Sequence, residues 1–153
     1  MAGQQREITV LFADLAGFTS ISERLGSEGT VALANRALSA LSTAIVEQDG
    51  YVNKFLGDGL MAFWSAFEPQ ADQARLACDA AAACQAALDE VNRDGEEILG
   101  LRLGIATGEA IVGDCGAPPD LNDYTAIGNT VNLAARLESA NKQLGTTTLI
   151  DEA

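Results

Sequence analysis

The chain has 153 residues, of which 22 are acidic and 9 are basic, so its formal net charge is −13, and it contains no histidine. The length and a hydrophobic content of 48% predict one folded domain, whereas a pI near 4.1 argues against non-specific binding to nucleic acid or anionic membranes. The lack of histidine excludes Ser–His–Asp and Cys–His catalysis, an imidazole base and a His-ligated zinc. Any chemistry must therefore come from carboxylates, amides, hydroxyls, lysine, arginine or a bound cation.

The cysteines and the N-terminus indicate a cytoplasmic location. Cys78, Cys84 and Cys115 form no CxxC pair and are odd in number, so we expect structural thiols in a reducing compartment. Residues 1–6 lack the apolar segment of a signal peptide. No apolar run approaches the roughly 20 residues of a membrane helix, so we expect no membrane contact by this segment.

The first half of the chain predicts a strand, helices and a hairpin. Residues 7–15 read as a buried strand, and the small residues after it form a turn into a helix capped by Thr19 or Ser20. Residues 28–48 predict a helix, because apolar residues recur at three- and four-residue steps. Its expected inward residues are Val31, Ala34, Leu38, Leu41 and Ile45. Residues 51–56 and 60–64 predict a hairpin around Gly57-Asp58-Gly59.

The second half predicts a further helix, a strand pair and a final helix and strand. An Ala-rich helix is expected from Pro69 to about Asn92, ended by Asp94-Gly95. Residues 101–107 and 110–112 predict strands joined at Gly108-Glu109, and residues 115–123 a polar loop. A short strand at 124–127, a helix at 129–142 and a strand at 146–150 follow. This order indicates an α+β fold with a mixed or antiparallel sheet and helices packed on one face.

Two acidic residues lie where strands are expected to end. Asp14 follows a buried strand, and the helix start behind it offers N–H groups that suit a phosphate. Asp58 lies at the tip of the hairpin, which could stand beside the first strand. Each residue alone is also compatible with a simple turn or capping role. Together, two carboxylates on adjacent strand tips suit a pair of Mg²⁺ ions.

Three further polar residues could either serve a substrate or lie at the surface. Lys54 stands among apolar residues of an apparently buried strand, where it needs a partner unless it extends to the rim. Asn132 and Arg136 are four residues apart and share one helix face. Arg136 either pairs with Glu138 or another acid, or stabilises charge on phosphate oxygens.

Four segments carry these residues in a fixed order along nearly the whole chain. They are FADLAGFTS (12–20), KFLGDG (54–59), LRLGIATGEAIVGD (101–114) and YTAIGNTVNLAARLE (124–138). Together they resemble the class III nucleotidyl cyclase catalytic domain. The resemblance implies a ferredoxin-like βαββαβ core and a head-to-tail homodimer whose active sites lie at the interface. It also implies that residues 1–153 form one such domain without the family's C-terminal strands and their phosphate-contacting lysine.

The resemblance implies a role for each residue in converting ATP to 3′,5′-cyclic AMP and pyrophosphate. Two Mg²⁺ or Mn²⁺ ions would be bound by one subunit. The groups that bind them would be Asp14, Asp58 and the carbonyl of Leu15. The backbone N–H groups of Gly17, Phe18 and Thr19 and the side chain of Arg102 would contact the phosphates. The other subunit would supply Lys54 and Thr125 to the base, and Asn132 and Arg136 to the ribose and the α-phosphate.

The pair of base-contacting residues favours adenine. Lys54 can only donate a hydrogen bond, which suits adenine N1 and opposes the N1–H of guanine. Thr125 stands where many members have Asp, as in a bacterial-type branch of the family. Its hydroxyl can accept a bond from the 6-amino group but can also donate one. The alternatives are a guanylyl cyclase and a catalytically weak or inactive homologue that binds nucleotide for regulation.

Overall fold

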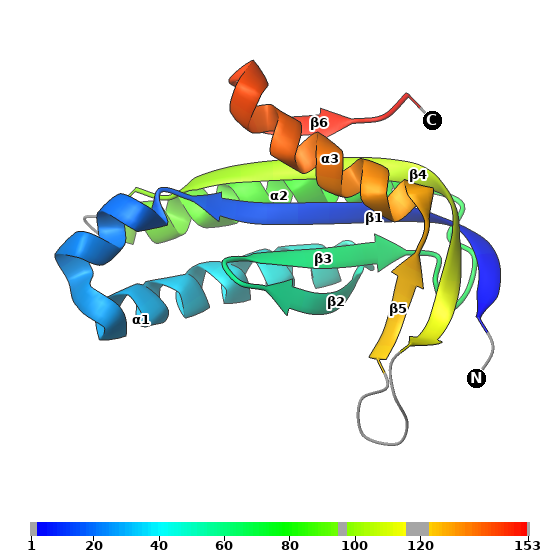
Figure 1. Cartoon of the computed structure of the whole chain (residues 1–153), viewed down its shortest axis with the longest axis horizontal. Helices are drawn as coiled ribbons and strands as arrows, with labels where there is room; N and C mark the ends of the chain where they lie inside the picture. The colour runs from blue at the N-terminus through cyan, green and yellow to red at the C-terminus, as the bar shows by residue number, and fades with distance from the viewer. Residues whose placement is uncertain (1–2, 95–97, 116–122, 153) are drawn as a thin grey trace.

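One mixed sheet organises the chain, and helices cover both of its faces (Figure 1). The computed structural model describes residues 3–94, 98–115 and 123–152, and within these residues the strand order is β2-β3-β1-β4-β5, with β6 beside β4. Every neighbouring pair is antiparallel except β4 with β6. The strands are β1 (Gln4–Ala16), β2 (Tyr51–Leu56), β3 (Gly59–Trp64), β4 (Gly100–Cys115), β5 (Asp123–Ile127) and β6 (Thr148–Ile150).

The helices are α1 (Phe18–Glu47), α2 (Gln73–Asp94) and α3 (Asn129–Leu144). The order β1-α1-β2-β3-α2-β4 confirms the expected α+β fold with a βαββαβ core and a mixed sheet. Helices α1 and α2 pack together on one face, whereas α3 packs on the other face against β4 and β1. The expectation that all helices share one face is therefore wrong for α3.

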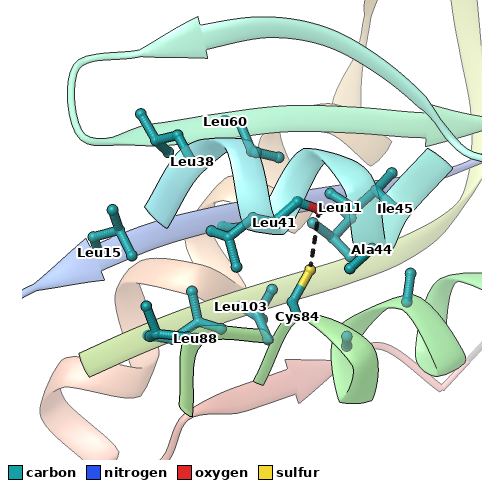
Figure 2. Close-up of a cluster of buried hydrophobic side chains, with 14 of the residues drawn as sticks. Leu11, Leu15, Leu38, Leu41, Ala44, Ile45, Leu60, Cys84, Leu88 and Leu103 are labelled. Carbon is teal, nitrogen blue, oxygen red and sulfur yellow. Dashed lines mark hydrogen bonds between the residues drawn. The ribbon is translucent and has the colours of Figure 1, made fainter. Parts of the chain in front are cut away.

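The central strand β1 is buried on both sides. Leu11 and Leu15 enter the cluster beneath α1 and α2, and Ile8 and Val10 enter the cluster beneath α3. Figure 2 shows Leu11 and Leu15 among leucines of α1, β3 and β4. Burial on both faces explains why this strand is apolar from Ile8 to Ala13 except for Thr9.

The cysteines differ in their surroundings. Cys84 is buried between α2 and α1, and its Sγ donates a hydrogen bond to the carbonyl of Leu41 at 3.7 Å (Figure 2). Burial raises the pKa of this thiol to about 12, so it packs as a small apolar residue. Cys78 is exposed, so the expectation of a core thiol is confirmed for Cys84 and wrong for Cys78. The side chain of Cys115 lies outside the described residues.

Helix α1 differs from its prediction at its start and in its orientation. It begins after Gly17 without a side-chain cap, so neither Thr19 nor Ser20 caps it. Gly26 at φ 72° interrupts the helix, and this left-handed conformation favours glycine. The buried stripe runs through Leu33 and Ala37 as well as Leu38, Leu41, Ala44 and Ile45, whereas Val31 is 58% exposed.

Among the described helices, α1 meets the length and hydropathy of a membrane-spanning helix. Core helices of globular domains meet the same test, because one apolar face raises their mean hydropathy. Here that face lies against the sheet and α2, as Figure 2 shows for Leu38, Leu41 and Ile45.

Strand β4 is continuous where the sequence predicted a turn. Gly108 and Glu109 pair with Ile8 and Glu7 of β1, so no hairpin forms there. A Cβ at Gly108 would meet the Thr130 hydroxyl at 2.6 Å, and that hydroxyl donates to the Glu109 carbonyl at 2.7 Å. The glycine is therefore required by the approach of α3, not by a turn.

The other elements follow their predictions, with small shifts at their ends. The hairpin of β2 and β3, helix α2, strand β5, helix α3 and strand β6 are all present, although α2 begins at Gln73 rather than at Pro69. The predicted loop at 115–123 and the predicted break at Asp94-Gly95 fall largely outside the described residues.

Gly104 sets how closely α3 approaches the sheet. A Cβ at this position would collide with the backbone carbonyl of Ala134 and the backbone N–H of Glu138. Asn141 fixes the same contact further along, because its amide donates to the carbonyl of Leu103 at 2.8 Å. Helix α3 therefore lies directly on β4, with no side chain between the two backbones at Gly104.

Gly104→Ala should move α3 away from β4 and lower the free energy of unfolding by roughly 1–3 kcal/mol, the usual cost of overpacking. Urea denaturation followed by circular dichroism measures this change. Gly100→Ala is the matched control, because its new Cβ would lie 3.3 Å from the Cβ of Ala16 and 3.9 Å from the Ala16 carbonyl oxygen, with no collision against a helix backbone. Equal stabilities of the two variants would contradict this account of the α3 contact.

Candidate active site

Asp14 lies near the end of β1, between two neighbouring strands. It pairs in register with Gly59 of β3 on one side and with Arg102 of β4 on the other. A Cβ at Gly59 would lie 3.1 Å from the Asp14 carboxylate and 2.5 Å from the carbonyl of Ala13. The absence of a side chain at Gly59 therefore leaves room for the Asp14 carboxylate.

Asp58 lies beside Asp14, as the sequence predicted. It occupies the turn between β2 and β3, and its backbone carbonyl accepts a hydrogen bond from the N–H of Leu15 at 3.0 Å. This bond joins the hairpin tip to the end of β1. The two carboxyl groups are close enough to share a side-chain hydrogen bond.

This closeness changes the acidity of Asp14. Burial first, and then the hydrogen bond and charge of Asp58, raise the pKa of Asp14 from 3.8 to about 7. The negative charge of Glu138 also raises it, and Arg102 lowers it. Without a cation, Asp14 therefore keeps its proton up to a pH close to neutral.

Glu138 belongs to this cluster, and the sequence analysis did not assign it to the site. Burial raises its pKa, Arg102 lowers it, and Asp58 raises it. A sequence signal was present, because Ala134, Glu138 and Asn141 recur at helical spacing and the outer two are buried. A carboxylate on the inward stripe of α3 indicated a partner on the sheet, and that partner is Arg102 rather than Arg136.

The N-terminus of α1 follows the acidic pair directly. Gly17 adopts φ 98°, which turns the chain from β1 into the helix. The N–H groups of Phe18 and Thr19 belong to the first turn, so they have no acceptor within the helix, and Thr19 is exposed. This end of the helix is thus an anion-binding position next to the carboxylates.

The residues at this end of the sheet fit a divalent cation that is completed by other ligands. Within the described residues, no group of three or more Asp, Glu, Cys or His side chains could hold a metal alone. Asp14 and Asp58 supply two neighbouring carboxyl groups, and a cation beside them would offset the cost of burying the Asp14 charge next to Asp58. Mg²⁺ commonly binds one or two carboxylates together with waters and substrate phosphates.

Lys54 and Thr125 lie on different strands, and Asn53, which precedes Lys54 in the chain, contacts Thr125. Lys54 is half-buried in β2, but β2 is the edge strand and is exposed at both ends, so the expectation of a buried strand is wrong. Thr125 of β5 is 7% exposed, and its hydroxyl donates to the side-chain oxygen of Asn53 at 2.8 Å. The residue next to Lys54 thus contacts Thr125.

Asn132 and Arg136 lie one turn apart on an exposed face of α3. Neither makes a side-chain hydrogen bond or an ion pair with Asp14 or Asp58, and within the described ranges Arg136 pairs with no carboxylate. Of the two alternatives for Arg136, the pairing with Glu138 or another acid is therefore not seen among the described residues. One chain therefore gathers Asp14, Asp58 and Arg102, and presents Asn132 and Arg136 separately.

Comparison with known proteins shows the family to which this chain belongs. Residues 1–147 match the family model described as the adenylate and guanylate cyclase catalytic domain. The chain belongs to this family. The family resemblance stated from the sequence motifs is thereby confirmed.

The relatives of this cyclase domain include larger adenylate cyclases. It is 38% identical to adenylate cyclase 1 of Rhizobium meliloti over 99% of this chain and 23% of that protein. It is 32% identical to the adenylate cyclase of Anabaena cylindrica, over 99% of this chain and 31% of that protein. The chain therefore spans less than a third of the length of these two relatives.

Solved structures with the same fold include cyclases of both purine specificities. The adenylyl cyclase CyaB from P. aeruginosa superposes with a TM-score of 0.86 at 35% identity, covering 92% of this chain and 74% of that one. The guanylyl cyclase Cya2 superposes with a TM-score of 0.85 at 37% identity, covering 92% and 73%. Overall similarity thus does not distinguish an ATP substrate from a GTP substrate.

The raised pKa of Asp14 predicts that the metal-free cyclase domain loses stability as the pH rises towards neutrality. Between 3.8 and about 7 the folded state holds a proton that the unfolded state has released, so the free energy of unfolding falls with increasing pH. Melting temperatures measured in EDTA from about pH 5 to about pH 8 should decline, and Asp14→Asn should flatten the decline.

Asp89→Asn is the control for removing one negative charge, because Asp89 is an exposed carboxylate on α2, outside the site. It should keep the slope of the unsubstituted protein. If Asp14→Asn shows that same slope, the raised pKa of Asp14 is refuted.

Proposed function

We propose that this cyclase domain converts ATP to 3′,5′-cyclic AMP and pyrophosphate in a head-to-tail homodimer. The observation that carries the proposal is the division of the site residues within one chain. Asp14, Asp58 and Arg102 share one end of the sheet, whereas Asn132 and Arg136 are exposed on α3 without contact to the acids. A second copy would bring the two groups together.

Asp14, Asp58 and the carbonyl of Leu15 would hold two Mg²⁺ or Mn²⁺ ions. These ions would lower the pKa of the ribose 3′-hydroxyl and neutralise charge on the triphosphate. The site favours a bound cation, because burial and the neighbouring Asp58 make it costly for Asp14 to carry a negative charge without one.

The phosphates would lie between the start of α1 and β4. The backbone N–H groups of Gly17, Phe18 and Thr19 would donate to the β- and γ-phosphates, where the helix dipole favours negative charge. Arg102 would contact the phosphates from β4. The electrostatic interactions of Arg102 with Asp14 and Glu138 would keep its side chain beside the phosphates.

The partner copy would orient the reacting atoms. Its Asn132 would hydrogen-bond the ribose, so that the 3′-oxygen faces the α-phosphorus in line with the departing pyrophosphate. Its Arg136 would stabilise the charge that develops on the α-phosphoryl oxygens. Both side chains are exposed on one face of α3, as contact with a second chain requires.

Lys54 and Thr125 of the partner copy would select adenine. The ammonium group of Lys54 donates to adenine N1, and the hydroxyl of Thr125 accepts from the 6-amino group. Two adenylate cyclases at 38% and 32% identity support this choice, and the guanylyl cyclase at 37% makes GTP the alternative to test.

Mixing two inactive variants should restore activity, because each would spoil a different half of a shared site. Asp14→Ala and Arg136→Ala should each lose nearly all cyclic AMP formation with ATP and Mn²⁺. An equal mixture should recover up to about a quarter of wild-type activity, because half of the dimers then carry one intact site of two. A coupled assay for pyrophosphate measures the recovery.

Asp14→Ala mixed with Asp58→Ala is the matched control. Both changes affect the same half-site, so every site in that mixture is damaged and no activity should return. If the wild type is active and the first mixture does not recover, the shared-site assignment is wrong.

Lys54→Glu should move the preference from ATP towards GTP. The carboxylate would accept from the guanine N1–H and repel adenine N1, and one such exchange is worth roughly tenfold in selectivity or more. The ratio of kcat/KM for ATP to that for GTP should therefore fall at least about tenfold. Equal use of both nucleotides by the wild type would refute this role of Lys54.

A further inference from the structure

The hydrogen bond between Thr125 and Asn53 joins two strands at opposite ends of the strand order. Asn53 lies in β2 and Thr125 in β5, and 72 residues separate them in the chain. Figure 1 shows β5 running across the direction of β2 and β3, near one end of their hairpin. The bond is 2.8 Å long and partly buried, and Thr125 as a residue is 7% exposed.

The direction of the bond determines what the Thr125 hydroxyl offers to a ligand. A threonine hydroxyl has one hydrogen and two lone pairs. Here the hydrogen is donated to the side-chain oxygen of Asn53. The lone pairs are what the hydroxyl retains for a ligand, so towards a ligand it acts as an acceptor.

A local irregularity of β2 places Asn53 at this point. The pairing of β2 with β3 shifts between Val52, opposite Ala62, and Lys54, opposite Met61, so Asn53 is the extra residue of a β-bulge. Bulges redirect side chains from the regular alternation and are common beside active sites. Asn53, the residue at the bulge, is the one that contacts Thr125 of β5.

We infer that Asn53 is a positioning residue that fixes Thr125 as an acceptor and thereby enforces adenine over 6-oxopurines. This inference rests on the proposed ATP site and deepens it. The 6-amino group of adenine donates to an acceptor, whereas the 6-oxo group of guanine or hypoxanthine faces the lone pairs of Thr125 and is repelled. Lys54 would thus recognise the atom at position 1 of the base, and Thr125, held by Asn53, would recognise the group at position 6.

The test compares ATP with ITP, because these nucleotides differ at positions 1 and 6 and ITP lacks the 2-amino group of GTP. In Asn53→Leu the Thr125 hydrogen is released and can donate to the 6-oxo group. The ratio of kcat/KM for ATP to that for ITP should fall about tenfold, mainly through better use of ITP, which matches the value of one hydrogen bond. Asn53→Asp keeps an acceptor and should retain the wild-type ratio.

Two results would overturn the inference. A purely structural role of Asn53 would lower both kcat/KM values in parallel and leave their ratio unchanged. If Asn53 acts through Thr125, then Asn53→Leu should change nothing further in a Thr125→Val background, so an additive effect there would also contradict the inference.

A binding measurement separates this inference from the proposed reaction. The dissociation constants of 3′-deoxy-ATP and 3′-deoxy-ITP, which lack the attacking hydroxyl, give the same selectivity without turnover. A chain that makes no cyclic AMP but loses its preference for 3′-deoxy-ATP in Asn53→Leu would refute the reaction and support the role of Asn53. A wild type that binds both analogues equally would refute the role of Asn53 whether or not it turns over ATP.

Discussion

The register of β1 between β3 and β4 is the constraint on which the site depends. It sets Asp14 opposite both Gly59 and Arg102, and the bond from Leu15 to the Asp58 carbonyl then brings the hairpin tip alongside. A shift of one residue would turn Asp14 to the other face of the sheet, among the leucines beneath α1 and α2. Burying an unpaired carboxylate among these leucines would be costly, so the core opposes such a shift and fixes the position of Asp14.

The fold and most site positions follow from local patterns in the sequence. Apolar periodicity and turn residues predict β1, the β2–β3 hairpin, α2 and α3, because those signals arise within a few residues of one another. The adjacency of Asp14 and Asp58 also follows, since both stand at strand ends. The missed features depend on residues that are distant in the sequence. Gly108 resembles a turn glycine in the sequence, whereas in the structure it makes room for Thr130 of α3. Glu138 resembles a surface acid, whereas in the structure it interacts with Arg102 of β4.

The buried stripe of α1 and the direction of the Thr125 hydroxyl are missed for the same reason. Val31 and Leu33 are both apolar, and their spacing in the sequence does not show that Leu33 is buried and Val31 exposed. A threonine hydroxyl in a sequence is both donor and acceptor, and only Asn53, on a strand far away in the chain, decides between the two. Sequence motifs can therefore indicate which residues contact a base without indicating what each one recognises.

The electrostatics of the proposed site are compatible with a triphosphate substrate even in so acidic a chain. The net charge of −13 opposes a triphosphate, yet the burial and the neighbouring charges of Asp58 and Glu138 that raise the pKa of Asp14 also favour a bound cation at this point. In the proposed dimer this acidic half-site would face Lys54 and Arg136 of the second copy. The attraction between the halves is then greatest when a nucleotide and its cations lie between them, so that assembly of the site and binding of the substrate reinforce each other.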